Sequence, residues 1–88
     1  MQDIFVYDIV ESLAGHDKGR FYVVLKVENA YVYLVDGKIR MIQNPKRKKR
    51  KHVAKICTNE SALTNMATDS EMKKVLAKAR GKFDRGGK

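Results

Sequence analysis

The sequence has a single cysteine, Cys57, one proline and no tryptophan among its 88 residues. One cysteine excludes an internal disulfide and a zinc site built on several thiolates, and it favours a reduced, cytoplasmic environment. No run of 18 apolar residues is present, so we expect no membrane-spanning helix and no membrane partner. The first twelve residues, MQDIFVYDIVES, lack the basic start and apolar run of a secretory signal peptide.

Acidic residues are scarce beside basic ones, with 10 Asp and Glu against 19 Lys and Arg and a formal net charge of +9. The first 44 residues carry five basic and six acidic side chains, whereas residues 45–55 carry seven basic and none acidic. Most of the excess is one run, Lys46, Arg47, Lys48, Lys49, Arg50 and Lys51, followed by His52 and Lys55. Because adjacent cations repel one another, we expect an extended, solvated basic loop over residues 45–52.

Three interpretations of this basic loop differ in the partner that they imply. It could be a solvated loop without a partner, or it could attract an anionic membrane or an acidic protein. A polyanion such as a nucleic acid would neutralise the run and release its counterions. Charge runs that are merely solvated are typical of chain ends, and this run lies between two apolar segments, which favours nucleic-acid contact.

A chain of this length, with 43% hydrophobic residues, forms one small core and leaves little room for a deep catalytic cleft. Five short segments have β-strand composition or spacing. They are Tyr7 to Leu13, Arg20 to Val27, Tyr31 to Val35, Lys38 to Ile42 and His52 to Cys57. In the second, alternation places Phe21, Val23, Leu25 and Val27 on one face and Tyr22, Val24 and Lys26 on the other.

Glycine and aspartate mark the predicted turns between these strands. Gly15 and Gly19 bracket a polar turn in which Asp17 is expected to close the turn on its own backbone. The pair Asp36-Gly37 is typical of a two-residue hairpin, so the strand at 38–42 is expected to return beside 31–35. Pro45 would end that strand and open the basic loop.

A helix is predicted after residue 68. Thr68 and Glu71 have the spacing of a capping box, with Thr68 as the N-cap. An apolar stripe recurs at helical spacing in Met72, Val75, Leu76, Ala79 and Phe83, with Lys73, Lys74, Lys78 and Lys82 off the stripe. Gly81 and Gly86-Gly87 are expected to end the helix, and residues 58–67 to form a connector with a helical turn near 62–66.

These elements predict a mainly β fold, a small bent barrel of about five strands with a C-terminal α-helix. The barrel would occupy residues 1–57, and the connector and helix residues 58–88. We expect the apolar stripe of the helix to pack on the barrel and its lysines to face solvent or a partner.

Residues 8–52 resemble a known family. The segment DIVESLAGHDKGRFYVVLKV resembles a KOW motif, with matches at Ile9, Val10, Ser12, Gly15, Asp17, Lys18, Gly19, Val23 and Val24. The following YVYLVDGKIR and PKRKKRKHV resemble, in the same order, the bacterial relatives of the fourteenth large-subunit ribosomal protein of archaea and eukaryotes. His16 stands where the loop of that family usually has a cation.

The resemblance implies an SH3-like (KOW) barrel and an RNA ligand, with ribosomal RNA and the large ribosomal subunit as expected partners. We expect the polar loop at Gly15 to Gly19 (the KOW loop), with Lys18 and Arg20, to meet the basic loop at one end of the barrel. The basic loop is expected to supply most of the affinity, and the KOW loop with Lys38 and Arg40 to set the register. The predicted RNA-binding residues are Gly15, His16, Lys18, Arg20, Lys38, Arg40, Lys46, Arg47, Lys48, Lys49, Arg50, Lys51, His52 and Lys55.

No catalytic constellation is visible, so no enzymatic activity, cofactor, metal or small-molecule substrate is expected. His16, His52 and Cys57 lack the spacing of a metal site or of an acid–base pair. Tyr22, Tyr31 and Tyr33 are expected to pack in or around the core, with base stacking as the alternative.

Two other functions stay open: a transcription-elongation module that contacts polymerase or DNA, and a module that binds an acidic peptide. Nothing in the sequence demands a dimer, and we expect a monomer.

Overall fold

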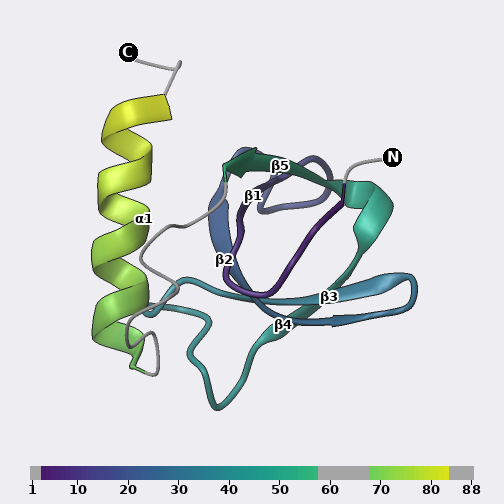
Figure 1. The fold of residues 1–88 in the computed structure, drawn as a ribbon, viewed down its shortest axis with the longest axis horizontal. Helices are drawn as coiled ribbons and strands as arrows, with labels where there is room; N and C mark the ends of the chain where they lie inside the picture. Colours follow the sequence, from purple (N-terminus) through teal and green to yellow (C-terminus); the bar gives the residue numbers. More distant parts are fainter. Residues whose placement is uncertain (1–2, 58–67, 84–88) are drawn as a thin grey trace.

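The computed structural model describes residues 3–57 and 68–83, which form five strands, a short 3-10 helix and one α-helix (Figure 1). The elements are β1 (Ile9–Ser12), β2 (Phe21–Glu28), β3 (Tyr31–Val35), β4 (Lys46–Lys49), η1 (Arg50–His52), β5 (Val53–Cys57) and α1 (Asp69–Phe83). All strand pairs are antiparallel, in the order β4-β3-β2-β1-β5.

The two edge strands of this sheet are neighbours in sequence, which forces the sheet to curl. Only η1 separates β4 from β5, yet they lie at opposite ends of the strand order. Two backbone hydrogen bonds hold the crossing in place: Arg50 N–H donates to the Ala30 carbonyl at 2.8 Å, and Leu13 N–H to the His52 carbonyl at 2.8 Å. The chain is thus a small SH3-like barrel with a C-terminal helix beside it, as predicted (Figure 1).

Strand alternation divides the buried apolar residues into two clusters, one on each face of the sheet. The barrel core consists of Ile4, Val10, Tyr22, Val24, Val32, Leu34 and Val53. The helix core consists of Ile9, Phe21, Val23 and Val35 on the sheet with Met72, Leu76 and Ala79 of α1. The sheet therefore buries one face inside the barrel, and part of its other face beneath the helix.

Helix α1 begins and packs as predicted. The Thr68 hydroxyl accepts a hydrogen bond from the Glu71 N–H at 3.2 Å, which satisfies one of the free donors of the first turn. Met72 and Leu76 are completely buried, and burial of such side chains stabilises the fold by about 1.5–3 kcal/mol each. Gly81, expected to end the helix, lies inside it, because the helix continues to Phe83. The predicted turn at 62–66, Gly86 and Gly87 lie outside the described residues.

The predicted face of Val27 in β2 is wrong. The pairing of β2 with β3 shifts register between Val24 and Lys26, so one extra residue interrupts the alternation. Val27 consequently pairs with Val32 and packs on the barrel core, whereas Leu25 packs on the helix core.

The predicted hairpin at Asp36-Gly37, with its return strand at 38–42, is also wrong. The Asp36 carboxylate accepts hydrogen bonds from the N–H groups of Lys38, Ile39 and Arg40 at 2.8–2.9 Å, which curls the backbone into a loop. This loop lies against the start of α1, where the Asp69 carboxylate accepts a hydrogen bond from the Ile42 N–H at 2.7 Å. The tight turn that joins paired strands lies instead at Asn29-Ala30, with Asn29 at a φ of 50°.

The partner of β3 is therefore the basic segment itself. Of residues 45–52, predicted as a loop, residues 46–52 form β4 and η1, and β4 pairs with β3 from Tyr31↔Lys49 to Leu34↔Lys46. Lysine and arginine are tolerated on an edge strand, because alternate side chains point to solvent. The contacts of the β4 side chains that point inward decide the properties of the site.

Candidate nucleic-acid interface

Strand β4 presents its cations to two different environments. Lys46 and Lys48 pair with Leu34 and Val32, which belong to the barrel core, so their side chains start on the inner face of the sheet. The Lys46 amine lies 2.9 Å from one carboxylate oxygen of Asp17, and the Lys48 amine lies 3.2 Å from the other. Both amines are thus held inside the protein by one carboxylate, which offsets one of their two charges.

Asp17 is the centre of this inner contact. It is 6% exposed, and its carboxylate also accepts hydrogen bonds from the Ser12 hydroxyl at 2.8 Å and the Tyr22 hydroxyl at 3.2 Å. Burial raises the pKa of this carboxyl, but hydrogen bonds from Lys46, Ser12 and Lys48 outweigh burial and hold the pKa well below its usual range. Asp17 is therefore ionised at neutral pH.

The same charge acts on Tyr22. Burial, together with the neighbouring Asp17 carboxylate, raises the pKa of Tyr22 to about 12, so its hydroxyl stays a donor. The predicted role of the Asp17 carboxylate as a turn closer is wrong. The turn is closed by backbone bonds, with the Arg20 N–H donating to the Asp17 carbonyl at 2.9 Å, while the carboxylate joins the turn to β4.

The polar loop and the basic segment meet, as predicted, but through different residues. Besides its bond to Asp17, the Lys48 amine donates to the Ala14 carbonyl at 3.0 Å. Gly15 adopts a φ of 85°, and a Cβ there would lie 3.7 Å from the same amine. Lys18 and Arg20, which were expected at this junction, are exposed in the loop.

The outer face of β3 and β4 carries cations and tyrosines together. Arg47 and Lys49 are exposed, and the Arg47 guanidinium lies over the Tyr31 ring, 4.6 Å from its centroid. The Lys26 amine lies over the Tyr33 ring at 5.4 Å. We call these five residues the cation–aromatic face. Both tyrosines are half-buried, and neither belongs to a core cluster. Of the three tyrosines predicted to pack in or around the core, only Tyr22 lies within it.

Glu28 is the acidic residue at the border of this face. The Tyr33 hydroxyl donates to its carboxylate at 2.9 Å, and the Lys26 amine lies 3.6 Å from it. The hydrogen bond from Tyr33, followed by the charge of Lys26, lowers the pKa of Glu28. Glu28 therefore offsets part of the charge of Lys26 and leaves Arg47 and Lys49 as the stronger anion attractors.

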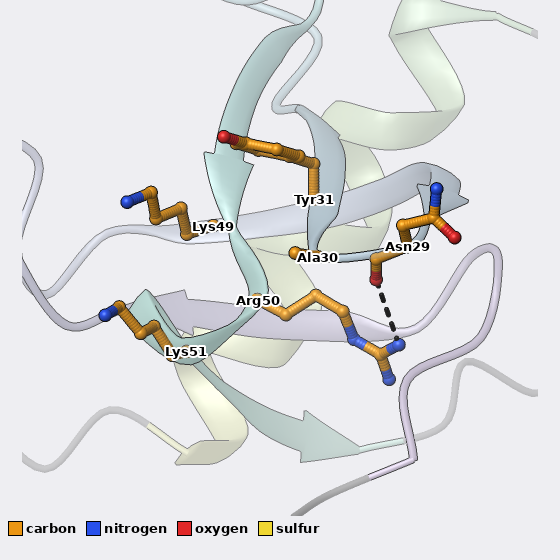
Figure 2. A pocket seen from close by; sticks show the side chains of 6 residues that line it. All are labelled: Asn29, Ala30, Tyr31, Lys49, Arg50 and Lys51. Atoms are coloured by element: carbon orange, nitrogen blue, oxygen red, sulfur yellow. Dashed lines mark hydrogen bonds between the residues drawn. The ribbon is translucent and has the colours of Figure 1, made fainter.

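A pocket of about 580 Å³ continues the face toward η1 (Figure 2). It is lined by Asn29, Ala30 and Tyr31 on one side and by Lys49, Arg50 and Lys51 on the other. The amines of Lys49 and Lys51 extend on the same side of the chain, and the guanidinium of Arg50 turns toward the Asn29 carbonyl, 3.4 Å away (Figure 2). Sequence reasoning did not predict this pocket, because its two sides come from separate segments.

The remaining predicted site residues do not join this face. His16 is exposed in the polar loop, Lys38 is exposed and Arg40 half-buried in the loop before β4, and His52 is half-buried in η1. Lys55 lies on the opposite edge strand, where its amine is 3.2 Å from the buried Asp8 carboxylate. The exposed cations brought together at the pocket and on β4 are thus Arg47, Lys49 and Lys51.

Other kinds of site find no support in the described ranges. Among residues 3–57 and 68–83, no three His, Cys, Asp or Glu side chains are placed to hold a metal ion. No described helix is long and apolar enough to cross a membrane.

Comparison with known proteins adds no assignment. A scan against protein-family models and a search of curated proteins each found no match. The resemblance of residues 8–52 to the KOW family remains a prediction.

Proposed function

We propose that this protein binds RNA through the cation–aromatic face and the adjoining pocket. One observation carries the proposal: β4 directs Arg47 and Lys49 to the same outer face as Tyr31 and Tyr33, while Lys46 and Lys48 turn inward to Asp17. Exposed Lys and Arg side chains bind phosphates and release counterions. Aromatic rings beside them offer stacking surfaces, a combination typical of RNA-binding sheets.

We further propose that the RNA is ribosomal. This step rests on the KOW resemblance of residues 8–52, which points to the large subunit. Folded RNA is recognised by its shape, phosphates and 2′-hydroxyls, and such recognition suits a sheet face on which Arg47 and Lys26 lie over tyrosine rings.

The decisive experiment compares two triple variants with equal charge removed. In one, Arg47→Gln, Lys49→Gln and Lys51→Gln empty the proposed site; in the other, Lys73→Gln, Lys78→Gln and Arg80→Gln remove exposed cations of α1. We expect the first to weaken binding to ribosomal RNA at least tenfold and to reduce the salt slope by about 2–3, and the second to change affinity little. Equal loss in both variants would show that net charge, and not this face, determines binding.

Sedimentation of the tagged protein through a sucrose gradient tests the ribosomal step. We expect co-migration with the large subunit, lost after nuclease treatment and in the Arg47, Lys49 and Lys51 variant. Tighter binding to duplex DNA than to folded RNA would favour a transcription role. Partners that resist nuclease would favour an acidic peptide as the ligand.

A further inference from the structure

We propose that the pocket between the β2–β3 turn and η1 binds a single unpaired nucleotide, with its base against the Tyr31 ring and its phosphate on Lys49 and Lys51. The inference rests on the proposed RNA-binding function and specifies its ligand. The volume of the pocket, about 580 Å³, lies in the range of pockets that hold small organic ligands, about 300–1,000 Å³.

The Tyr31 ring supplies the stacking surface. Arg47 lies over this ring at 4.6 Å but does not line the pocket, whereas Ala30 and Lys49 do. In Figure 2 the ring is seen nearly edge-on above Ala30, so one of its faces is turned toward the pocket. The guanidinium on the ring and the half-buried position fix the ring before any ligand arrives, which reduces the entropy lost on binding.

The phosphate site lies on the rim of the same pocket. Lys49 and Lys51 are exposed, and neither amine forms an ion pair within residues 3–57 and 68–83. They differ in this respect from Lys46 and Lys48, which are bound to Asp17. Their amines extend on one side of the chain (Figure 2), which is where the proposal places the phosphate.

Arg50 provides a donor that the protein leaves largely unused. Its Nε is buried and has no hydrogen-bond partner in the described part of the chain, and its Nη1 bond to the Asn29 carbonyl is long, 3.4 Å. A guanidinium carries five N–H donors. The exposed ones can donate to the sugar hydroxyl or the base carbonyl of a bound nucleotide.

The geometry favours an unpaired nucleotide over a duplex. In a duplex, neighbouring bases cover both faces of each internal base, so no internal base face is available to the Tyr31 ring. An unpaired base exposes its π-face, and stacking of one base on an aromatic ring contributes about 1–3 kcal/mol. The choice of base is left open by stacking, because every base has such a face.

The test measures binding of the full chain to two fluorescent RNAs, an eight-residue oligouridylate and a 12-base-pair RNA duplex. Tyr31→Ala is expected to weaken oligouridylate binding by about 5–160-fold, the equivalent of one lost stacking contact, and to change duplex affinity less than twofold. Tyr31→Phe keeps the ring and should retain the affinity for both RNAs. Phe5→Ala, which removes a 63% exposed ring outside the cation–aromatic face and the pocket, is the matched control and should leave both affinities within twofold.

A second variant covers the case in which Tyr31→Ala fails to fold. Ala30→Leu narrows the pocket and leaves the ring in place, so it should weaken oligouridylate binding selectively. If folded Tyr31→Ala and Ala30→Leu bind oligouridylate like the parent, or lose both RNAs equally, the nucleotide pocket is wrong, while phosphate binding by the face can still stand. If the parent chain binds neither these RNAs nor ribosomal RNA, the proposed function itself fails.

Discussion

Asp17 shows how much a single residue determines in this small protein. Its buried carboxylate has four side-chain partners, two hydroxyls and two amines, which come from β1, β2 and β4. Removal of one member of a buried, hydrogen-bonded ion pair leaves the partner charges unpaired, and such losses are typically about 3–5 kcal/mol. Since the Lys46 side chain is 29% exposed and can regain water, we expect the lower end of that range.

The lowered pKa of Asp17 predicts how stability depends on pH. A carboxyl whose pKa is lower in the folded than in the unfolded chain stabilises the fold above the unfolded value, about 3.9, and loses this contribution as pH falls below it. We expect the free energy of unfolding of the parent chain to exceed that of Asp17→Asn by about 2–4 kcal/mol at pH 7. This difference should shrink by about 1 kcal/mol between pH 5 and pH 3. Thermal unfolding of both chains across this range gives the measurement.

The same pair of chains supplies the control. Other carboxyl groups titrate alike in the parent and in Asp17→Asn, so they cancel in the difference. A difference that stays constant down to pH 3, or that grows, would contradict the assignment of an ionised Asp17.

At the scale of elements, β4 has two faces with different roles. Its inner lysines hold the polar loop through Asp17 and Ala14, and its outer cations face solvent. A solvated loop, as predicted for residues 45–52, would allow all six cations of the run to be replaced by alanine without loss of folding. The structure contradicts the basis of that expectation, because Lys46 and Lys48 neutralise a buried charge.

Neighbouring lysines of β4 should therefore respond differently to the same substitution. We expect Lys48→Ala to lower the free energy of unfolding by about 2–3 kcal/mol, since it removes an ion pair from a side chain that is 11% exposed. Lys49→Ala should stay within about 0.5 kcal/mol of the parent and weaken RNA binding instead. Urea unfolding together with RNA titration separates the two effects, and equal destabilisation would argue against the inward direction of Lys48.

The loop over residues 36–45 depends on one glycine. Gly37 has a φ of 75°, and a Cβ there would collide with the backbone carbonyl of Asp69 at the start of α1. Gly19 has a similar φ of 91° but no atom within 4 Å of a built Cβ. The two positions share the backbone conformation and differ in the space around it.

This pair predicts a graded effect of alanine. Gly19→Ala should destabilise the fold by about 1–2 kcal/mol, the strain of a left-handed residue. Gly37→Ala should exceed that by at least about 1 kcal/mol, since α1 must also move away from the loop. Thermal unfolding of both variants tests this, and a smaller effect at Gly37 would show that α1 is not held against the loop.

At the scale of the whole molecule, a net charge of +9 overstates what one site can offer an anion. Lys46 and Lys48 are bound to Asp17, and Lys55 to Asp8 on the opposite edge strand. The proposed site retains Arg47, Lys49 and Lys51, with Arg50 partly available in the pocket.

The salt dependence of binding should follow the number of cations that the proposed site retains, and not the net charge of the chain. For the eight-residue oligouridylate we expect log K to fall against log salt with a slope of about −2 to −3, from three or four phosphate contacts at about −0.7 each. Six free cations would give a slope steeper than −4. Titrations at several salt concentrations measure it, and a slope near −4 or steeper would contradict a site of three or four cations.

Much of the fold could be predicted, because it depends on local patterns. Alternating apolar residues placed β2 and β3 almost to the residue, Gly15 and Gly19 took the positive φ expected of turn glycines, and Thr68 caps the helix. Each of these features depends on side chains within a few positions of one another. The mainly β class and the terminal helix follow from them.

What only the tertiary structure decided are the contacts between distant segments. Asp17 meets Lys48 across 31 positions, and Ile42 meets Asp69 across 27, so no local pattern indicates that the basic run is a strand or that residues 36–45 are a loop. The sequence determined that cations are concentrated between residues 46 and 51. The curling of the sheet decided which of them pair with Asp17 inside and which face solvent beside Tyr31, because a carboxylate strongly attracts only the cations that folding brings within reach.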